Sequence, residues 1–523
     1  MVKRAGGALL LSIDIDHASR RPVSTQLYSA LRDSIVAGDL APGDRLPASR
    51  TLARDLVLSR TTVIEAFDRL TSEGLIESRV GSGTFVSAAL RAERPMPVPL
   101  ADSAHAAPPR EPRLSRAMAH AVQRFSDRQR LPASARAFKT ALPAFDVFPM
   151  AQWARLSAKH WRGDGGDRSD AMGYGDPYGH AQLRRAIASH LRANRGISCD
   201  AEQIFIVGGA QQAFHLIGSI LLNPGDKVWF ENPGAIGARN SLIASGAELV
   251  PVPVDGEGLR VDDGLAVAPR FRLAFVTPSH QQPLGSVMSL ERRFALLQAA
   301  ARANAWIIED DYDGEFFFGG RPLPTLKSVD ATGLVIYVGT FSKSLFPSLR
   351  LGFILAPPGL IDIFRTVMSK FLQGVPSFSQ AVVAEFIDEG HFASHIRRMR
   401  KIYAERHDAL CDAAKKTLDG LLDVVRTDSG LHTIGHLRNG VREVDASVAA
   451  DARKITASPI ARFSIAPAGV NGLVLGFGGV TPQQIRSGVG VLAEVLEEQS
   501  RKGGRRDQSD ASRKARSTAL IRV

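Results

Sequence analysis

The sequence predicts two folded parts, a small three-helix head with a β-hairpin and a large α/β body built on a mainly parallel sheet. Apolar residues recur at helical spacing near the start of the chain, and two short β-like runs follow them. Prolines then crowd residues 91–140, which separates the head from the rest. From residue 204 onward, apolar strand-like runs alternate with helical patterns, which is typical of an α/β fold.

Composition excludes several classes of protein. The chain has 523 residues, of which 44% are hydrophobic and 23% charged, so it is not disordered throughout. Its two cysteines, Cys199 and Cys411, lie far apart, which argues against a disulfide framework or a cysteine-based zinc site, and we expect no metal. The opening MVKRAGGALLLSIDID has too short an apolar core for a signal peptide, and no stretch approaches the ~20 apolar residues of a membrane span. We therefore expect a cytoplasmic protein that does not bind membranes.

The net charge of +12 points to a polyanionic partner, but it is unevenly distributed. Residues 91–140 and 500–523 carry +6 each, whereas residues 1–90 carry +1 and residues 141–499 carry −1. We therefore predict that the two basic segments add salt-dependent attraction to a polyanion, to which the nearly neutral head and body add little charge.

Composition and residue pattern divide the chain into four segments. We expect the head over residues 20–88 and a Pro- and Arg-rich extended linker over residues 89–137. The body is expected over residues 138–498. The basic, polar remainder, residues 499–523, is expected to be a disordered tail.

The head has the pattern of a winged helix-turn-helix. Ser49 can cap its second helix and Ser59 its third, so a very short turn joins the two. The third helix stops at Gly74, and the β-like runs Leu75–Arg79 and Thr84–Ser87 predict a hairpin or wing. Apolar residues three or four positions apart predict the first and third helices, namely Leu27, Leu31 and Ile35, then Val63, Phe67 and Leu70.

The start of the third predicted helix is a candidate DNA-binding surface, because the second helix of a helix-turn-helix unit enters the major groove. Side chains there can reach base edges or phosphates, and Gly83 lets the wing approach DNA closely. The alternative is a helical dimerisation or cap domain with a solvated basic face. The candidate DNA-binding residues are Arg45, Ser49, Arg50, Ser59, Arg60, Thr61, Thr62 and Gly83.

The head resembles the GntR-type winged-helix domain along its whole length. The resemblance is carried by PGDRLPASRTLA, LSRTTVIEAFDRLTSEG and GSGTFV, which follow one another in that order and spacing. It implies binding to double-stranded operator or promoter DNA.

Polar clusters follow the strand-like runs of the body, where open α/β sheets bind their ligands. Lys343 follows one run and can form a Schiff base with an aldehyde cofactor. The hydroxyls of Thr340 and Ser342 and the guanidinium of Arg350 suit a phosphate. The helix that begins at Ala210-Gln211 offers backbone N–H groups to an anion.

A carboxylate completes the pattern. Asp310 ends another strand-like run and can hold the protonated pyridine nitrogen that pyridoxal phosphate needs as an electron sink. Tyr312, two residues on, can donate to a cofactor oxygen. Taken singly, the Ser/Lys loop can be merely solvated, EDDYD can be a cation site or an acidic loop, and the Gly208-Gly209 pair can serve helix packing. Their position at successive strand ends makes a shared cofactor site the stronger hypothesis.

The body resembles a fold-type I aminotransferase, in the regulatory form of the MocR/GabR family. That family fuses a GntR-type head to an aminotransferase-like domain through a long linker, which implies a pyridoxal-phosphate fold and a homodimer with head-to-tail domain exchange. The motifs that carry the resemblance are YGDPYGHAQLRRAIASHLRANRGI (174–197), GGAQQAF (208–214), ENPGAIGAR (231–239), TPSHQQPLG (277–285), IIEDDYDGEF (307–316), GTFSKSLFPSLRLGF (339–353) and GHFASHIRRMRKIY (390–403).

The resemblance implies roles for individual residues. Lys343 would be the catalytic lysine of the internal aldimine, Asp310 would pair with the pyridine nitrogen, with Asp311 as the alternative, and Tyr312 would face the phenolic oxygen. Other residues would hold the phosphate or line the far side of the cofactor: Thr340, Ser342, Arg350 and the Ala210-Gln211 backbone for the phosphate, and His280 and Gln281 for the far side.

The sequence departs from the family pattern at three places. Ala235 occupies the position of the usual Tyr that stacks on the pyridine ring, and the SHQ loop continues as Gln282-Pro283-Leu284-Gly285. Val474 lies where aminotransferases place an Arg for the substrate carboxylate, and Arg438 or Arg462 can compensate for it. Without that clamp, ordinary transamination becomes less favourable.

Three functions compete. The leading hypothesis is a pyridoxal-phosphate-dependent transcription regulator that senses a small amine or amino-acid-like effector through formation of an external aldimine. The second is a working aminotransferase with a self-regulating DNA-binding head, because Lys343 and Asp310 permit a half-reaction. The third is a dimerisation scaffold without cofactor, which Ala235 favours and the retained Lys343, Asp310, Tyr312 and Arg350 oppose.

Overall fold

The computed structural model describes residues 13–79, 81–89, 113–127, 136–162, 172–319 and 323–520, with the backbone alone beyond residue 502. The chain divides into two units, Met1–Arg113 and Leu114–Val523. No helix in the described ranges is long and apolar enough to cross a membrane.

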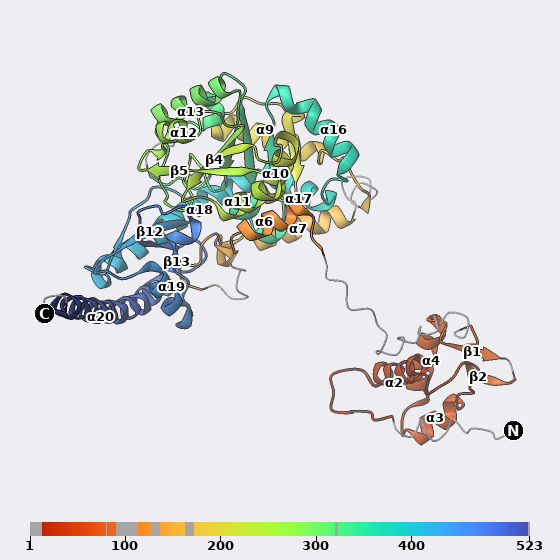
Figure 1. The fold of residues 1–523 in the computed structure, drawn as a ribbon. Helices are drawn as coiled ribbons and strands as arrows, with labels where there is room; N and C mark the ends of the chain where they lie inside the picture. Colours follow the sequence, from red (N-terminus) through yellow and green to blue (C-terminus); the bar gives the residue numbers. More distant parts are fainter. Residues whose placement is uncertain are drawn as a thin grey trace. The chain divides into compact units, whose positions relative to one another are not determined.

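The first unit has the helices and the hairpin that the sequence predicts (Figure 1). Leu27, Leu31, Val63 and Leu70 are buried together at its centre, because each recurs on the inward face of its helix. The elements are α2 (Val23–Ala37), α3 (Ser49–Asp55), α4 (Arg60–Ser72), β1 (Ile76–Arg79) and β2 (Gly83–Val86), and the two strands pair antiparallel.

One of the two predicted helix caps is wrong. The side chain of Ser59 caps α4 by accepting a hydrogen bond from the Thr62 amide at 3.1 Å. Ser49, in contrast, is the first residue of α3, the cap position belongs to Ala48, and no side chain caps the helix there. The turn is short enough that Val57 adopts a φ of 55°, which is uncommon for a β-branched residue.

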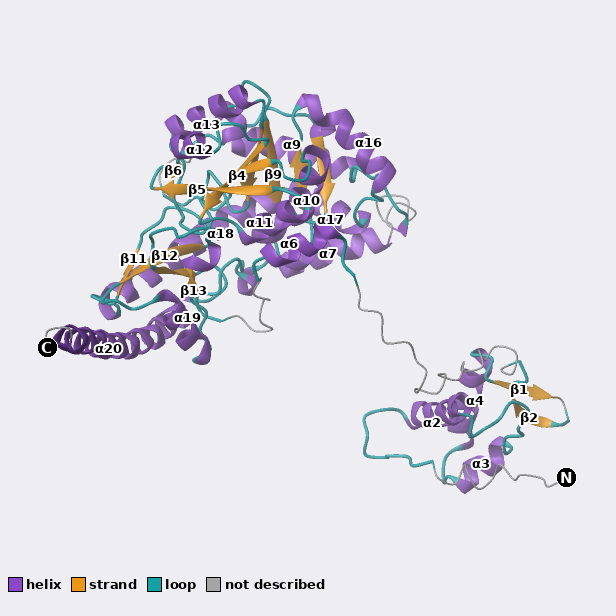
Figure 2. Ribbon diagram, in the orientation of Figure 1, coloured by secondary structure: helices purple, strands orange, loops and turns teal. Residues whose placement is uncertain are grey.

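The second unit is built on an eight-stranded sheet (Figure 2). Its spatial order is β3-β10-β9-β8-β7-β4-β5-β6. The central strands run parallel, whereas β10 is antiparallel to both neighbours and β6 is antiparallel to β5. The strands are β3 (Ile204–Val207), β4 (Lys227–Asn232), β5 (Glu248–Asp255), β6 (Gly258–Leu259), β7 (Leu273–Val276), β8 (Trp306–Asp311), β9 (Val335–Thr340) and β10 (Gly352–Leu355).

Both faces of this sheet are buried, as expected for parallel strands covered by helices. Along β7, Phe275 packs into one hydrophobic cluster while its neighbours Ala274 and Val276 pack into another, because successive side chains point to opposite faces. The α-helices around the sheet are α9 (Ala181–Arg195), α10 (Ala210–Leu221), α11 (Ile236–Ala244), α12 (Val261–Val267), α13 (Leu290–Ala303), α14 (Leu326–Val329), α15 (Phe341–Ser344), α16 (Ile361–Phe371) and α17 (Ser377–Asp388).

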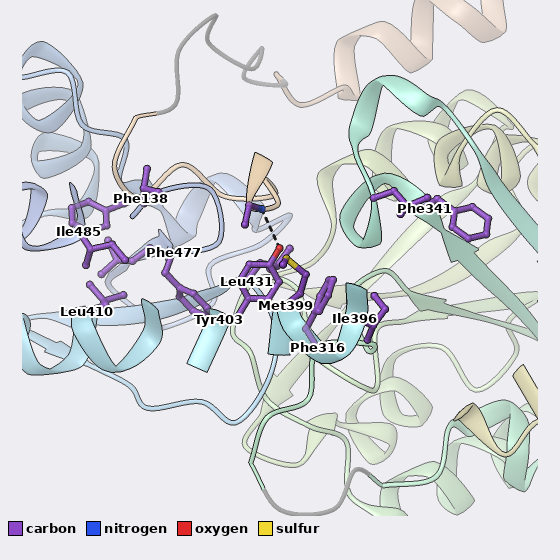
Figure 3. Close-up of a cluster of buried hydrophobic side chains, with 14 of the residues drawn as sticks. Phe138, Phe316, Phe341, Ile396, Met399, Tyr403, Leu410, Leu431, Phe477 and Ile485 are labelled. Carbon is purple, nitrogen blue, oxygen red and sulfur yellow. Dashed lines mark hydrogen bonds between the residues drawn. The ribbon is translucent and has the colours of Figure 1, made fainter. Parts of the chain in front are cut away.

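A smaller antiparallel sheet, in the order β11-β12-β14-β13, lies after the long helix α18 (His391–Thr417). The largest hydrophobic cluster joins this part to the rest of the unit (Figure 3), and Tyr403 at its centre accepts a hydrogen bond from the Ala144 amide at 3.1 Å. The elements are β11 (Leu422–Val424), β12 (His432–Leu437), α19 (Glu443–Ala452), β13 (Ser458–Pro459), β14 (Gly472–Gly476) and α20 (Pro482–Leu520), with short 3-10 helices at Phe145–Val147, Ala201–Gln203, Pro347–Leu349, Pro358–Leu360 and Ile460–Phe463.

The predicted linker differs from the structure at its C-terminal end. Residues Arg116–Arg124 form helix α6, which Ser115 caps, and Ala121 packs into the core of the second unit. No proline lies between Pro112 and Pro132, so nothing blocks a helix over residues 116–124. A further helix, α7 (Met150–Arg162), follows near the start of the body. Residues 90–112 and 128–135 of the predicted linker lie outside the described residues.

The tail also differs from the prediction, because α20 continues to Leu520. Its first turns are anchored by buried residues such as Val489 and Leu496. Once a helix is nucleated, propagation is easy through a segment without proline. Ion pairs four residues apart, Glu497–Arg501 and Glu498–Lys502, support the helix beyond its buried part.

Candidate functional site

A cavity of about 320 Å³ lies in the second unit beside the carboxyl ends of the central strands. The loops that follow β8 and β9 supply its floor, and the start of α10 supplies one wall. Eight of the nine predicted cofactor residues line it, namely Ala210, Gln211, Asp310, Tyr312, Thr340, Ser342, Lys343 and Arg350. The exception is His280.

One end of the cavity offers groups that suit an anion. Thr340 Oγ1 accepts from the Ser342 amide at 3.2 Å and donates to Ser342 Oγ at 3.1 Å, which fixes both hydroxyls beside the start of α10. Arg350 adopts a left-handed φ of 51°, and its guanidinium lies against Gly209, where a Cβ would be 3.6 Å from Arg350 Cζ. Helix N-terminus, hydroxyls and guanidinium together provide the donors that a phosphate requires.

Asp310 is a buried carboxylate with an unused oxygen. Its side chain is 5% exposed, and Oδ1 has no hydrogen-bond partner among the described residues. Burial, followed by the negative charge of Asp311, raises the pKa of Asp310 well above its ordinary value. A buried acceptor of this kind is costly unless a ligand donates to it. A protonated pyridine nitrogen is such a donor, so Asp310 fits the ring of pyridoxal phosphate.

Asp311, the alternative to Asp310, does not line the cavity. Its Oδ2 accepts hydrogen bonds from Arg195 Nη2 and from Tyr337 Oη, and the three side chains are buried together. Successive residues of a strand point to opposite faces, so Asp311 faces away from the cavity that Asp310 borders. The alternation of strand β8 therefore separates a structural carboxylate from one that faces the cavity.

Lys343 lies on the single-turn helix α15 between the two ends of the cavity. Its ammonium donates to the carbonyl oxygen of Ala141 at 3.1 Å. Ala141 belongs to an irregular segment over residues 136–142 and adopts a left-handed φ of 67°. The lysine is thus oriented by a carbonyl far away in sequence, a contact that no sequence motif indicated.

His280 lies behind Tyr312 rather than in the cavity wall, which corrects its predicted position. It is 1% exposed, and its Nδ1 is 3.0 Å from Tyr312 Oη and 2.9 Å from Asp313 Oδ2. Gln281 also lies elsewhere, because its amide donates to Glu231 and to the carbonyl oxygens of Pro233 and Gln282. The neighbouring Gln282, for which no role was predicted, lines the cavity.

Glu231 is the hub that holds this loop to the sheet. It is fully buried and accepts from the Thr277 amide and hydroxyl at 3.0 and 2.6 Å and from Gln281 Nε2 at 3.0 Å. Burial raises the pKa of Glu231 to about 7, and the hydrogen bonds oppose that shift. Glu231 therefore fixes the loop that carries Gln282 into the cavity.

The structure shows where the residues that depart from the family pattern lie. Ala235 lines the cavity and is 3% exposed, so it leaves room where a larger ring would lie. Phe214 and Phe463 supply other aromatic rings to the lining. Val474 is buried in β14, and its side chain borders a small pocket beside Lys343.

The two arginines that could replace the missing carboxylate clamp lie in different places. Arg438 is exposed and pairs with Asp423 outside the cavity. Arg462 lines the cavity, as do Lys139 and Ser458, three residues to which the sequence assigned no firm role. Burial, and then the nearby Arg462, lower the pKa of Lys139. Among the described residues that line the cavity, Asp310 is the one carboxylate. The part of the cavity that Arg462 and Lys139 line therefore favours an anion.

In the head, the predicted DNA-binding residues gather around α3, α4 and the wing. Arg50, Ser59, Arg60 and Thr61 are exposed at or next to the starts of the two helices, and Thr62 and Ser49 are half-buried. Gly83 has a φ of 109°, and its missing Cβ leaves space for the Arg45 side chain, whose Nε would lie 3.0 Å from it. Gly83 therefore leaves room for the Arg45 side chain beside the turn of the wing.

The comparisons with known proteins agree with both parts. Residues 23–86 match the family of bacterial regulatory proteins of the gntR type, and residues 145–489 match aminotransferase class I and II. The chain is 40% identical to the probable rhizopine catabolism regulatory protein MocR of Rhizobium meliloti, over 92% of this chain and 95% of that protein. It is 28% identical to the pyridoxine biosynthesis transcriptional regulator PdxR of Corynebacterium glutamicum, over 90% and 95%.

A solved structure supports the same conclusion for the body. The α-aminoadipate aminotransferase LysN of Thermus thermophilus, in complex with N-(5'-phosphopyridoxyl)-L-leucine, shares 26% identity with a TM-score of 0.65. The likeness covers 74% of this chain and 99% of that one. Pyridoxal 5'-phosphate is accordingly the cofactor of the body. With a gntR-type head joined to an aminotransferase class I and II domain, the chain belongs to the MocR family of DNA-binding transcription regulators.

Proposed function

We propose that this regulator senses a small amine or amino-acid-like effector at its cofactor site and changes its action on DNA in response. The observation that carries the proposal is the cavity itself. It brings an amine, Lys343, a buried carboxylate with an unused oxygen, Asp310, and an anion-binding end into one space. The same chain carries a gntR-type head at residues 23–86.

Each part of the cofactor has a matching group. Thr340, Ser342, Arg350 and the backbone at Ala210 would hold the phosphate, and Asp310 would accept from the pyridine nitrogen. When bound, pyridoxal phosphate supplies an aldehyde that condenses reversibly with primary amines. Lys343 is the amine of this chain placed for that reaction, and an effector amine would compete with it.

Release of Lys343 provides a route for the signal. The Lys343 ammonium donates to Ala141, which follows the predicted linker by only a few residues. A change at the lysine therefore acts on the segment over residues 136–142, which lies within the second unit at the C-terminal end of the predicted linker. An effector shifts the regulator between two states only by the difference in its affinity for them, and this contact differs between lysine bound and lysine released.

The effector we expect is an amine that also carries an anionic group. Val474 removes the usual carboxylate clamp, but Arg462 and Lys139 line the cavity with no second carboxylate among its described lining. The guanidinium of Arg462 also donates to the carbonyl oxygen of Asp127 at 2.7 Å, which holds it in place. A carboxylate, sulfonate or phosphate on the effector would suit this pair.

On DNA, we propose that α4 enters the major groove. Arg60 and Thr61 would reach base edges, Arg50 and Ser59 would contact phosphates, and Arg45 would act beside the turn of the wing. The basic residues of the head are nearly balanced by acidic ones, which leaves a net charge of only +1 over residues 1–90, so the head would gain specificity from these placed contacts.

We also propose a homodimer with head-to-tail domain exchange. The exposed large apolar side chains of the second unit include Trp161, Met172, Tyr174 and Phe371. Trp161 stacks on Phe378 of α17, and Gly175 lies against Ser377 at the start of the same helix, so these segments adjoin. Exposed apolar side chains that gather on one surface are typical of interfaces between proteins, and we propose that these residues contact the second copy.

One absorption experiment tests the sensing proposal. Purified protein with added pyridoxal phosphate should gain a visible band, Lys343→Ala should lose it, and Lys401→Ala, an exposed lysine of α18, should keep it. Amines with and without an anionic group should then be compared by the change in this band and by gel shift on the promoter fragment of the protein itself. A wild-type spectrum unchanged by the cofactor would overturn the proposal.

A further inference from the structure

Behind the cavity, two buried side chains both contact the same ring nitrogen of a third, His280. His280 Nδ1 is 2.9 Å from Asp313 Oδ2 and 3.0 Å from Tyr312 Oη, and Tyr312 borders the cavity. His280 and Asp313 do not line that cavity, and neither has a role in the function proposed above. We propose that Asp313 fixes the tautomer of His280 and thereby aims the Tyr312 hydroxyl proton into the cavity, toward the phenolic oxygen of the cofactor.

The tautomer follows from which atoms have partners. An ionised Asp313 can only accept hydrogen bonds, so the proton of a neutral His280 belongs on Nδ1, which faces it. His280 Nε2 is buried with no hydrogen-bond partner among the described residues. A proton on Nε2 would therefore leave one donor unsatisfied and deprive Asp313 of its hydrogen bond, each at a cost.

The ring is held in this orientation by the backbone around it. Gly430 has a φ of 82°, and a Cβ there would lie 2.1 Å from His280 Cε1. Gly285 lies on the Nε2 side, where a Cβ would be 3.2 Å from that nitrogen. The two glycines leave a slot the shape of an imidazole, so the Nδ1 edge stays turned toward Asp313 and Tyr312.

The direction of the Tyr312 hydroxyl is then determined. With a proton on His280 Nδ1, the oxygen of Tyr312 can only accept from it, and its own proton must point elsewhere. Tyr312 lines the cavity that contains Lys343 and Asp310, which is much larger than the two small pockets that Tyr312 also borders, so we propose that the proton points into this cavity. Burial and the charge of Asp313 raise the pKa of Tyr312 well above its ordinary value, so the hydroxyl keeps the proton that it donates. Asp313 and His280 are thus positioning residues, because they act through Tyr312.

Other ionisable groups face this cluster and bear on any titration. His432 on β12 lies with its ring centroid 4.8 Å from that of His280, and burial lowers the pKa of His432 well below its ordinary value, so it is neutral. Asp310, Asp311 and Glu231 act on Tyr312 by their charges, and Lys343 acts on His432. All of these groups are present in the wild type and in each variant that is compared with it below.

The inference rests on the proposed cofactor site, and the test is the pH at which the visible band of the bound cofactor changes. A donor aimed at the phenolic oxygen favours the deprotonated, more negative form of the chromophore. Tyr312→Phe removes the donor, so the midpoint should rise by about one pH unit, the size expected for one hydrogen bond to a charged group. Asp313→Asn lets His280 accept from Tyr312 and should raise it similarly.

The sign and the additivity of these shifts identify the mechanism. Loss of the Asp313 negative charge alone would lower the midpoint, so a rise in Asp313→Asn reports the turned hydroxyl. In the double variant, Asp313→Asn should add no further rise to that of Tyr312→Phe. Asp423→Asn, an exposed aspartate paired with Arg438, is the control and should leave the midpoint unchanged.

Two results would overturn the inference. One is an Asp313→Asn midpoint equal to or below that of the wild type, in a variant that binds the cofactor normally. The other needs no variant of Asp313: in protein labelled with ¹⁵N-histidine, and with the His280 signals identified from His280→Gln, the proton should be found on Nδ1, and its presence on Nε2 would refute the tautomer. Failure of the wild-type protein to gain a visible band would refute the cofactor site instead.

Discussion

Replacement of Asp310 by Asn should have opposite effects on the protein with and without cofactor. Asp310 Oδ1 is buried without a partner among the described residues, and the pKa of Asp310 is raised well above its ordinary value by burial. Without cofactor, the carboxylate is therefore a source of instability that an amide reduces. With cofactor, it is the acceptor for the pyridine nitrogen, which an amide cannot match in charge.

The magnitudes follow from these contacts. An unsatisfied buried polar group costs about 1–3 kcal/mol and a charged one more, so the change to an amide should recover on the order of 1–2 kcal/mol. Unfolding entropy is about 2.1 cal/mol/K per residue, so in a unit as long as Leu114–Val523 this raises the Tm by about 1–2 °C. A hydrogen bond to a charged group is worth about 1.5–3 kcal/mol, so the cofactor Kd should weaken about 10- to 150-fold.

The gain in stability should depend on pH. Because the folded pKa of Asp310 lies above the unfolded one, the folded wild type binds more protons and loses stability as pH rises between the two values. The Asn variant lacks this loss. The difference in Tm between the two proteins should thus be absent below the ordinary carboxyl pKa and largest above the folded pKa.

Calorimetry of the cofactor-free protein and absorbance titration with pyridoxal phosphate measure the two effects. Asp311→Asn is the matched control, because Asp311 is the next residue of β8 but pairs with Arg195 and Tyr337. Loss of one partner from a buried ion pair costs about 3–5 kcal/mol, so this variant should lower the Tm. If Asp310→Asn lowers the Tm as Asp311→Asn does, or leaves the cofactor Kd unchanged, the role given to Asp310 is wrong.

Four further outcomes are expected. Arg60→Ala should weaken binding to the promoter fragment about tenfold or more in a fluorescence anisotropy assay, since a bidentate base contact is worth about 1–3 kcal/mol, and unchanged binding would misplace the recognition helix. Ser59→Ala removes the α4 cap, worth about 1 kcal/mol, and should lower the Tm of the head by about 4–8 °C, whereas Ser49→Ala should not, because Ser49 caps nothing. Ala235→Tyr should tighten the cofactor Kd about 2- to 12-fold in an absorbance titration through ring stacking, and weaker binding would mean that the ring does not fit. Deletion of residues 500–523 should reduce the slope of DNA affinity against salt while operator preference stays intact. Loss of operator preference would contradict the division of roles between head and tail.

The sequence predicted the elements of the head and the sheet because their signals are local. Helical spacing of Leu27, Leu31 and Ile35 requires one buried face, and the structure buries all three residues. The misassigned cap at Ser49 shows the limit of such signals, because Ser is favoured both as a cap and in the first turn of a helix. The helices α6 and α20 were missed for a related reason: their polar, basic composition resembles that of disordered chain, and each is stabilised by packing at one part only.

The same distinction between local and non-local signals applies to the residues of the site. Residues at or just after the ends of strands, such as Asp310 and Lys343, could be placed at one edge of the sheet from the α/β pattern alone. Residues that reach the cavity from distant segments, such as Lys139 and Arg462, could not, because no local pattern says which loop folds over which strand end. His280 was placed in the cavity wall because its motif adjoins the site, and only the side-chain packing shows that it lies one layer behind.

The contacts behind and beside the cavity explain how one fold can serve as a sensor. A regulator needs groups whose partners change when the effector binds, and Lys343 is such a group, because its amine also holds Ala141. It equally needs groups whose partners do not change, so that the cofactor stays in one orientation and protonation state. Asp313, His280 and Glu231 are buried, and none of them lines the cavity. Asp313 contacts His280, His280 contacts Tyr312 of the cavity wall, and Glu231 holds the loop that carries Gln282. The contact that we expect to change, between Lys343 and Ala141, lies at the C-terminal end of the predicted linker, whereas the contacts that we expect to stay fixed lie beside the sheet.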